Sequence, residues 1–370
     1  MVRARYNPYG GAERFVANAL SALQAQGVQL TIVTRSWQQQ AGIAALVVNP
    51  FYLGNVWRDW SFAREVCKRL EGGVFDLVQS HERLTCCDVY RAGDGVHREW
   101  LKQRIRAAGQ WQRLSIAANP YHRYMLRAER RVFASPQLKA VICNSAMVKR
   151  EIQHYFQLPE SKLHVIYSGV DGERFSPGLR LRRDSFRAQH GIASDALVYL
   201  FVGSGFERKG VGCFLQALAR LPSSCVGLIV GRDKHHSRFE RLATRLGIEQ
   251  RVRFTGGVEN TAPAYGAADI FVLPTLYDPF PNAALEAMAS ALPVITSHKS
   301  GAAELIEDGT NGFLCDALDV TQLAQHMAAL QDEALRRALG AAARKTVLPL
   351  TLEAMSARLI ALYHQLLELH

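Results

Sequence analysis

The chain has 370 residues, of which 48% are hydrophobic and 21% are charged. This length predicts two domains of about 150–200 residues each, and the composition excludes a disordered chain. Lys and Arg number 44 against 33 Asp and Glu, so the net charge of +11 favours a polyanionic partner: nucleic acid, a phosphorylated substrate or an anionic lipid surface.

In the first half, short apolar runs alternate with helical patterns. Such alternation is typical of a parallel sheet covered by helices. The predicted strands are Val28 to Thr34, Phe75 to Ser80, Asp88 to Ala92 and Lys139 to Asn144, and the predicted helices are Ala12 to Gln26 and Ser61 to Leu70. Residues 1–6 provide almost no strand before the Gly10-Gly11 turn, so we expect the first strand to be truncated and the native N-terminus to begin upstream.

The second half repeats this alternation more regularly, with Gly and Pro at the junctions. The predicted strands are Ala196 to Gly203, Val226 to Gly231, Val252 to Thr255, Ile270 to Pro274 and Pro293 to Thr296. Both halves therefore predict an α/β class with doubly wound sheets, in which ligands bind at the carboxyl ends of the strands.

A segment rich in Gly and Pro, residues 167–178, is typical of a linker between domains. We predict two Rossmann-like domains, an N-terminal one at 1–170 and a C-terminal one at 171–349. The two domains are expected to face a central cleft. Residues 350–370 form an amphipathic pattern and are predicted to be a helix that packs near the domain junction.

The seven cysteines are scattered, without a C-x-x-C pair: Cys67, Cys86, Cys87, Cys143, Cys213, Cys225 and Cys315. We expect them to be buried free thiols in a reducing cytosol. No segment approaches the ~20 apolar residues of a membrane span, and the N-terminus lacks a signal-peptide pattern. The sequence thus predicts a soluble or peripheral protein.

A glycine-rich segment, residues 203–210, follows one predicted strand and precedes a helix. Glycines such as Gly203 let the backbone approach a ligand closely, and a helix start offers unpaired N–H groups. Arg208 and Lys209 place two cations where a diphosphate would lie. A glycine turn with two solvated cations explains the segment equally well.

A second segment, residues 278–286, places two carboxylates eight positions apart. Asp278 lies in a proline-stiffened loop and Glu286 one turn into a helix, for which Asn282 is the predicted N-cap. Glu286 is expected to accept hydrogen bonds from a ribose and Asp278 from sugar hydroxyls. The alternative is a structural mid-helix acid and a turn-forming Asp, which the apolar surroundings of Glu286 disfavour.

Residues 278–286 resemble the E-x7-E motif of the family-4 retaining glycosyltransferases, with Asp in place of the first Glu. The Tyr9 to Arg14, Gly203 to Gly210, Ala291 to Thr296 and Gly301 to Phe313 segments resemble the same family. The resemblance extends over nearly the whole chain and is greatest to the lipopolysaccharide core glucosyltransferases. It implies the glycosyltransferase-B (GT-B) fold, with an acceptor-binding N-terminal domain at 1–170 and a nucleotide-sugar-binding C-terminal domain at 171–349.

The resemblance also implies roles for single residues. Arg208 and Lys209 would hold the donor diphosphate, Glu286 the ribose and Asp278 the transferred hexose. Gly10 and Gly11 would line the donor from the other domain, and the backbone of Val258 would lie near uracil. The implied donor-binding residues are Gly10, Gly11, Gly203, Arg208, Lys209, Val258, Asp278, Asn282, Ala283, Ala284 and Glu286; those implied in catalysis are Asp94, Arg208, Lys209 and Asp278.

The expected reaction is a retaining, metal-independent transfer of a hexose, with glucose from UDP-glucose as the leading donor and a lipopolysaccharide core heptose or related glycolipid as the acceptor. Departure of a nucleoside diphosphate leaves negative charge that preorganised cations stabilise. The sequence contains no D-x-D pair to hold Mg²⁺ or Mn²⁺, so no cofactor is expected.

Asp94 follows a predicted strand in the first half, between two glycines. By position it resembles the family residue near the reacting centre, where it would position or deprotonate the acceptor hydroxyl, with front-side attack giving retention. A turn-forming Asp is an equally good interpretation. His97 and the His81-Glu82 pair are second choices.

Residues 97–131 are strongly basic and contain interleaved Trp and Tyr. The cations assigned to a membrane or acceptor surface are Arg98, Lys102, Arg104, Arg106, Arg123, Arg127, Arg130 and Arg131. Such a segment suits an anionic membrane or a phosphorylated glycolipid. The same cations could bind the phosphates of RNA, but the sequence contains no nucleic-acid-binding motif. The other alternative is that these residues form a solvated helical face. We therefore expect a cytoplasmic protein peripheral at the inner face of the inner membrane.

Two further functions stay open. The first is glycosyl transfer in another polysaccharide or glycolipid pathway, or from another donor. The second is a non-enzymatic nucleotide-binding protein, because a fold alone does not fix function.

Overall fold

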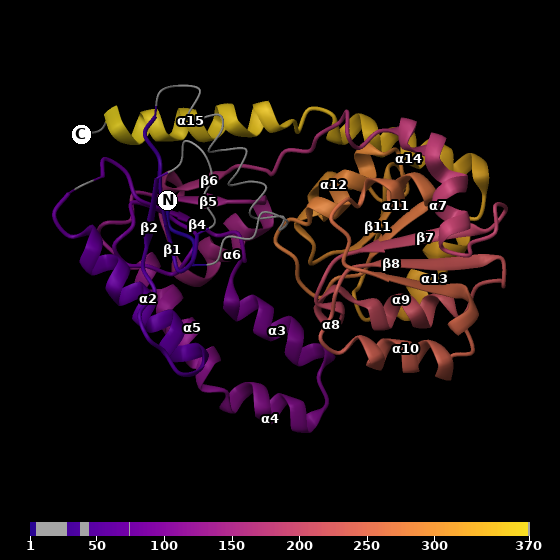
Figure 1. The fold of residues 1–370 in the computed structure, drawn as a ribbon, viewed down its shortest axis with the longest axis horizontal. Helices are drawn as coiled ribbons and strands as arrows, with labels where there is room; N and C mark the ends of the chain where they lie inside the picture. The colour runs from indigo at the N-terminus through magenta and orange to yellow at the C-terminus, as the bar shows by residue number, and fades with distance from the viewer. Residues whose placement is uncertain (5–27, 38–43, 74, 369–370) are drawn as a thin grey trace. The chain divides into compact units, whose positions relative to one another are not determined.

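The computed structural model describes residues 1–4, 28–37, 44–73 and 75–368, and the chain divides into two compact units (Figure 1). Unit 1 comprises Met1–Ser168 with Leu352–His370, and unit 2 comprises Gly169–Thr351. The predicted Gly10-Gly11 turn and the predicted helix at 12–26 lie outside the described residues.

Unit 2 is built on a six-stranded parallel sheet of order β12-β11-β10-β7-β8-β9. Its strands are β7 (Leu197–Val202), β8 (Cys225–Val230), β9 (Val252–Gly256), β10 (Ile270–Leu273), β11 (Val294–Ser297) and β12 (Gly312–Cys315). The central strands are almost entirely apolar because both faces of a parallel sheet are covered. From β7 the chain builds outward through β8 and β9, then returns to build the other side from β10.

Helices follow most strands of unit 2. They are α7 (Arg183–Gln189), α8 (Phe206–Lys209), α9 (Val211–Leu218), α10 (His236–Arg245), α11 (Ala262–Ala267), α12 (Asn282–Ala289), α13 (Val320–Ala329) and α14 (Glu333–Val347), with 3-10 turns η2 (Pro177–Arg182), η3 (Glu249–Arg251) and η4 (Gly301–Leu305). Side chains cap the last two helices: the Asp319 carboxylate accepts from the N–H of Gln322, and the Asp332 carboxylate from that of Leu335. Such caps define where a helix starts.

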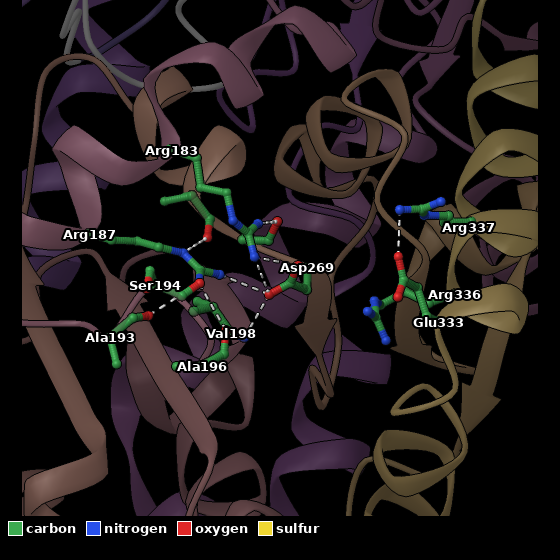
Figure 2. Close-up of polar contacts among 12 residues, drawn as sticks. Arg183, Arg187, Ala193, Ser194, Ala196, Val198, Asp269, Glu333, Arg336 and Arg337 are labelled. Carbon is green, nitrogen blue, oxygen red and sulfur yellow. Dashed lines mark hydrogen bonds and ion pairs between the residues drawn. The ribbon is translucent and has the colours of Figure 1, made fainter.

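A buried ion cluster fastens α7 to the start of β10 (Figure 2). Arg183 Nη2 lies 2.8 Å from Asp269 Oδ1, and Arg187 Nη2 lies 2.9 Å from Asp269 Oδ2. Arg187, only 1% exposed, also donates to the carbonyls of Ser194 and Ala196. The guanidinium thus satisfies carbonyls of the turn before β7 that would otherwise be buried without a partner.

Unit 1 contains a four-stranded parallel sheet, β3 (Gln79–Ser80), β4 (Val89–Arg91), β5 (Ala140–Cys143) and β6 (Leu163–Val165). Val2 bridges in parallel to Ser80 on one side and to Val33 on the other. It thereby joins this sheet to the parallel pair β1 (Thr31–Thr34) and β2 (Ala44–Val47). The first residues of the chain therefore lie in the middle of the unit 1 strand array.

The described helices of unit 1 are α2 (Gly54–Leu70), α3 (His97–Ala107), α4 (Gln110–Ala118), α5 (Pro120–Phe133), α6 (Ala146–Phe156) and α15 (Leu352–Glu368), with the 3-10 turn η1 (Glu160–Lys162). Helix α15 belongs to unit 1 although it ends the chain. Its Met355, Leu359, Leu362 and Leu366 pack with Ile32, Val89, Ala140, Ile142 and Ile166 in one core cluster.

The expectation of free thiols was wrong for one pair. Cys67 on α2 and Cys86 after β3 form a disulfide, with their Cα atoms 5.5 Å apart. Cys87, Cys143, Cys213, Cys225 and Cys315 are free, and all of these except Cys213 are buried. A spacing of 19 residues carries no pairing signal in a sequence, because the contact depends on how α2 packs.

The stretch Glu333–Glu368 is long and apolar enough to span a membrane by length and composition alone. Core helices of soluble proteins meet the same criterion. Here the stretch contains two helices, α14 and α15, and each buries one apolar stripe: Leu339, Ala343 and Val347 in unit 2, and Met355, Leu359, Leu362 and Leu366 in unit 1.

Candidate active site

Two loops meet at the carboxyl edge of the unit 2 sheet. One follows β7 and the other follows β10. These two strands are parallel neighbours in the sheet, although Gly203 and Ile270 are 67 positions apart in the sequence. Connections leave β7 and β10 toward opposite sides of the sheet, so this is the topological switch point at which α/β sheets bind ligands. Seven of the predicted donor residues lie on these two loops or at the start of α12: Gly203, Arg208, Lys209, Asp278, Asn282, Ala283 and Ala284.

The loop after β7 depends on glycine at two positions. Gly203 has φ +157°, and a Cβ there would lie 2.7 Å from Lys209 Cδ. Gly210 has φ +84°, and a Cβ there would lie 2.0 Å from the carbonyl oxygen of Pro274. Both backbone conformations are costly for side-chain-bearing residues. The glycines therefore permit the close approach of the loops after β7 and β10.

An ion pair joins these loops. Lys209 Nζ lies 2.7 Å from Asp278 Oδ2, and Arg208 Nη1 lies 4.0 Å from the same oxygen. Burial opposes ionisation of Asp278, but Lys209 and Arg208 outweigh it and hold the pKa of this carboxyl below its ordinary value. Arg208 also donates to the carbonyl of Tyr277 and is 38% exposed. The site thus carries a buried, ionised acid with two cations beside it.

The loop after β11 supports Asp278 from the other side. Asp278 forms an isolated parallel bridge with Ser300, through N–H donation from Asp278 to the Lys299 carbonyl and from Gly301 to the Asp278 carbonyl. The Ser300 hydroxyl is buried, and no hydrogen bond to it occurs within the described part of the chain. Sequence reasoning missed this support because the bridge is a tertiary contact of two loops.

Glu286 lies inside α12 and is 6% exposed. The Tyr265 hydroxyl on α11 donates to its Oε2 atom at 2.8 Å. Tyr265 was not predicted as a site residue. A buried acid in an apolar helix needs a hydrogen-bond donor, so the presence of some donor could have been expected. Asn282 was wrongly predicted as the N-cap: Pro281 occupies that position, and Asn282 is the first helical residue, followed by Ala283 and Ala284.

The loops after β8 and β9 extend the same edge. Val258 follows β9 and is 43% exposed, which leaves it accessible to a ligand. The backbone N–H of Phe206 donates to Asp233 Oδ2 at 2.7 Å, and that of Arg232 to the Ser204 hydroxyl. These contacts fix the glycine loop against β8. Neither Arg232 nor Asp233 was singled out from the sequence.

In unit 1, Asp94 lies in a turn just after β4, and its side chain is 65% exposed. Its Oδ2 lies 3.9 Å from Arg83 Nη1, while Arg83 also pairs with buried Glu129 at 2.9 Å. The structure therefore places Asp94 both in a turn and beside a buried cation. Glu129 accepts the backbone N–H of His97 as well, which anchors the start of α3.

The second-choice histidines are buried. Burial, with Arg83 and His122 nearby, lowers the pKa of His97 to about 3. Burial and the nearby Arg91 and Arg3 hold the pKa of His81 well below its ordinary value. Both side chains are neutral at physiological pH and suit structural hydrogen bonding: His97 Nε2 lies 3.1 Å from His122 Nδ1.

The predicted basic surface lies on α3 and α5. Exposed members are Arg98, Lys102, Arg106, Arg123, Arg127, Arg130 and Arg131. Arg104 is half-buried and contacts His122. The cations that point outward from these two helices outnumber the acids on them, since Glu99 and Glu129 are both buried.

Within the described residues, no group of three or more His, Cys, Asp or Glu side chains is placed to hold a metal ion. The negative charge of Asp278 is already balanced by Lys209 and Arg208. One positive charge more than is needed to balance Asp278 is therefore available beside it for an anionic ligand.

Two family models match the chain in succession. Residues 9–174 match "Glycosyltransferase Family 4" and residues 182–346 match "Glycosyl transferases group 1". The first match covers most of unit 1, and the second covers the loops at the carboxyl edge of unit 2.

Curated relatives match over most of the chain. Lipopolysaccharide glucosyltransferase WaaG of Escherichia coli is 28% identical over 90% of this chain and 87% of its own. A D-inositol 3-phosphate glycosyltransferase of Geodermatophilus obscurus is 30% identical, over 74% of this chain and 63% of its own.

Solved structures share the fold. The crystal structure of WaaG matches with a TM-score of 0.85 at 25% identity, over 98% of each chain. Anabaena HepE in complex with UDP-glucose matches with a TM-score of 0.76 at 19% identity, also over 98% of each chain.

Proposed function

Because the chain belongs to the family-4 glycosyltransferases and has their GT-B fold, we propose that it transfers a hexose, glucose from UDP-glucose, to a lipopolysaccharide core heptose or related glycolipid. The proposed reaction retains the anomeric configuration and needs no metal. The observation that carries it is the convergence of Arg208, Lys209 and Asp278 at the switch point of the unit 2 sheet.

The donor assignment follows from charge and position. The relative WaaG is a lipopolysaccharide glucosyltransferase, and the similar structure of Anabaena HepE contains UDP-glucose. In this chain, Lys209 and Arg208 supply the cations for a diphosphate, and Gly203 lets it approach the backbone. Glu286, oriented by Tyr265, is assigned to the ribose, and the backbone near Val258 to the base.

Catalysis in this proposal is electrostatic. As the bond between the anomeric carbon and the diphosphate breaks, negative charge grows on the leaving phosphate. Lys209 is held in place by Asp278 before the donor arrives, so little reorganisation is needed when that charge develops. Two fixed cations supply the compensation that a divalent metal provides in other transferases.

The acceptor is assigned to unit 1. Asp94 is exposed at the carboxyl end of β4 and is our candidate for orienting the acceptor hydroxyl. The exposed cations of α3 and α5 suit the phosphates of a glycolipid and an anionic membrane surface. We therefore propose peripheral association with the inner face of the cytoplasmic membrane.

A second acceptor class has support of its own. Several relatives carry the name D-inositol 3-phosphate glycosyltransferase, and one of them is 30% identical. A phosphorylated polyol would also complement the cations of α3 and α5. A non-enzymatic nucleotide-binding protein is the remaining alternative.

The deciding experiment offers the purified protein a panel of UDP-sugars and measures UDP release, with and without heptose-containing core acceptor, with inositol phosphate, and with EDTA. UDP-glucose is expected to be consumed fastest, with EDTA having no effect. The anomeric configuration of the product is read by NMR. Calorimetry that detects no UDP binding would move the protein to the non-enzymatic class.

A further inference from the structure

Large apolar side chains are exposed at the beginning of α2. We call Phe51, Tyr52, Leu53, Trp57 and Trp60 the α2 apolar patch. Phe51 is 72% exposed, Leu53 68%, Trp57 41% and Trp60 43%. Contiguous apolar side chains of this size on a protein surface mark a binding face.

The patch is held in shape. The ring centroids of Phe51 and Trp57 lie 5.7 Å apart in an edge-to-face contact. The opposite face of α2 is buried, with Phe62 and Val66 in a core cluster of unit 1. A disulfide also fastens the C-terminal half of α2. The outer face is therefore presented by a rigid helix.

Cations continue this outer face toward the C-terminus of α2. The Arg64 guanidinium lies 5.4 Å from the centroid of the Trp60 ring, and Lys68 follows one turn later. The acids of the helix are already paired, Asp59 with Arg58 and Glu65 with Arg69. The face is thus aromatic at one end and cationic at the other.

Helix α5, which bears the basic surface, packs beside α2 (Figure 1). The Tyr121 hydroxyl at its start donates to Asp59 Oδ2 at 3.0 Å and joins the two helices. The apolar patch and the exposed arginines of α5 therefore belong to one rigid part of unit 1.

We propose that the α2 apolar patch inserts into the interfacial region of an anionic lipid bilayer. This inference rests on the membrane part of the proposed function and names the element that enters the lipid. Trp and Tyr favour the level of the headgroups, and cations beside them attract anionic lipid. A second copy of the chain is the other candidate occupant, and the test below distinguishes it from lipid.

The test measures partitioning onto vesicles of phosphatidylglycerol and phosphatidylcholine by co-sedimentation, at low and high NaCl. The variant Phe51→Ser/Leu53→Ser is expected to bind about tenfold or more weakly, with the largest difference at high salt, where the cations are screened. Trp57→Gln/Trp60→Gln is expected to lose the fluorescence quenching that brominated lipids cause. The matched control is Leu181→Ser in unit 2, which removes a leucine 92% exposed and is expected to bind as wild type.

Unchanged partitioning of both patch variants would overturn the inference. Light scattering that shows a dimer dissociated by Trp57→Gln/Trp60→Gln would also overturn it, in favour of a second copy. Calorimetry of UDP binding distinguishes failure of the membrane inference from failure of the proposed function. The patch variants are expected to keep UDP affinity, which also verifies folding, whereas Lys209→Met is expected to lose it and still bind vesicles.

Discussion

Lys209 and Asp278 are 69 positions apart in the chain, yet their side chains form a 2.7 Å ion pair at the carboxyl edge of one sheet. The pair exists because β7 and β10 are neighbours and because glycine at 210 lets the loop after β7 contact Pro274. The Lys209 ammonium, which we assign to the donor diphosphate, is thereby held in position by Asp278.

Replacement of Lys209 by Ala is expected to lower kcat about 10²–10³-fold, because it removes one of the cations that face the leaving phosphate. Steady-state UDP release measures the effect. Arg245→Ala on the exposed face of α10 is the matched loss of one cation from unit 2 and is expected to keep wild-type turnover. Equal activity in both variants would contradict the assignment of Lys209.

Asp278 links acidity to stability. The pKa of the Asp278 carboxyl is lower in the folded protein than its ordinary value of 3.8. Ionised Asp278 therefore contributes fully to the free energy of unfolding at pH values above 3.8. The contribution is lost as the pH falls through the lower folded-state pKa. Urea unfolding of wild type and Asp278→Asn is therefore expected to show a gap in unfolding free energy at neutral pH that narrows at strongly acid pH. A constant gap would contradict the ion pair.

Tyr265→Phe removes the hydroxyl that holds Glu286. We expect a stability loss of about 1–3 kcal/mol, since a buried carboxylate oxygen loses its donor, and a higher KM for the donor, since the ribose-binding acid is less fixed. Thermal unfolding and donor titration measure the two effects. Tyr199→Phe on β7, which removes a buried hydroxyl that donates to the Met327 carbonyl, serves as a comparison in which the donor KM is expected to be unchanged.

The buried cluster at Asp269 offers a double-mutant cycle. Arg187→Met leaves Asp269 with one cationic partner instead of two and leaves the carbonyls of Ser194 and Ala196 without this donor, which is expected to cost about 3–5 kcal/mol of unfolding free energy. The double variant Arg187→Met/Asp269→Asn is expected to be less destabilised than the sum of the singles, since it leaves no unpaired buried charge. Strict additivity in denaturant titrations would show that the two side chains act independently.

The disulfide predicts sensitivity to reductant. The Cys67–Cys86 bond closes a loop between residues 19 positions apart. Reducing it is expected to lower the free energy of unfolding by about 3 kcal/mol, because the unfolded chain gains conformational entropy. Wild type is therefore expected to melt at a lower temperature with dithiothreitol, whereas Cys67→Ser/Cys86→Ser melts at one temperature in either condition. Cys87→Ser, beside the bridge, is expected to keep the dependence on reductant.

Much of unit 2 was predictable from the sequence because its strands are buried on both faces and read as continuous apolar runs. β7, β8, β9, β10 and β11 all fall within a residue or two of their predicted ranges. The edge strands β2 and β6 of unit 1 and β12 of unit 2 were missed, because a short apolar run does not itself show whether it pairs at the edge of a sheet.

At the site, the residues supplied by motifs were predicted, and those supplied by packing were not. Arg208, Lys209 and Glu286 were expected to converge; the structure places Arg208 and Lys209 beside Asp278, and Tyr265 beside Glu286. Tyr265 and Ser300 were missed, since each reaches the site from a different loop or helix. The Cys67–Cys86 pairing depends on how α2 packs, and no local pattern encodes that contact.

The position of α15 has a consequence for how the chain folds during synthesis. Unit 2 is one continuous stretch, whereas the core of unit 1 includes Leu359 and Leu362, which follow all of unit 2 in the chain. All of unit 2 is therefore available to fold before unit 1 can complete its interior. During synthesis, unit 1 is therefore the first unit to leave the ribosome and the last to complete its core.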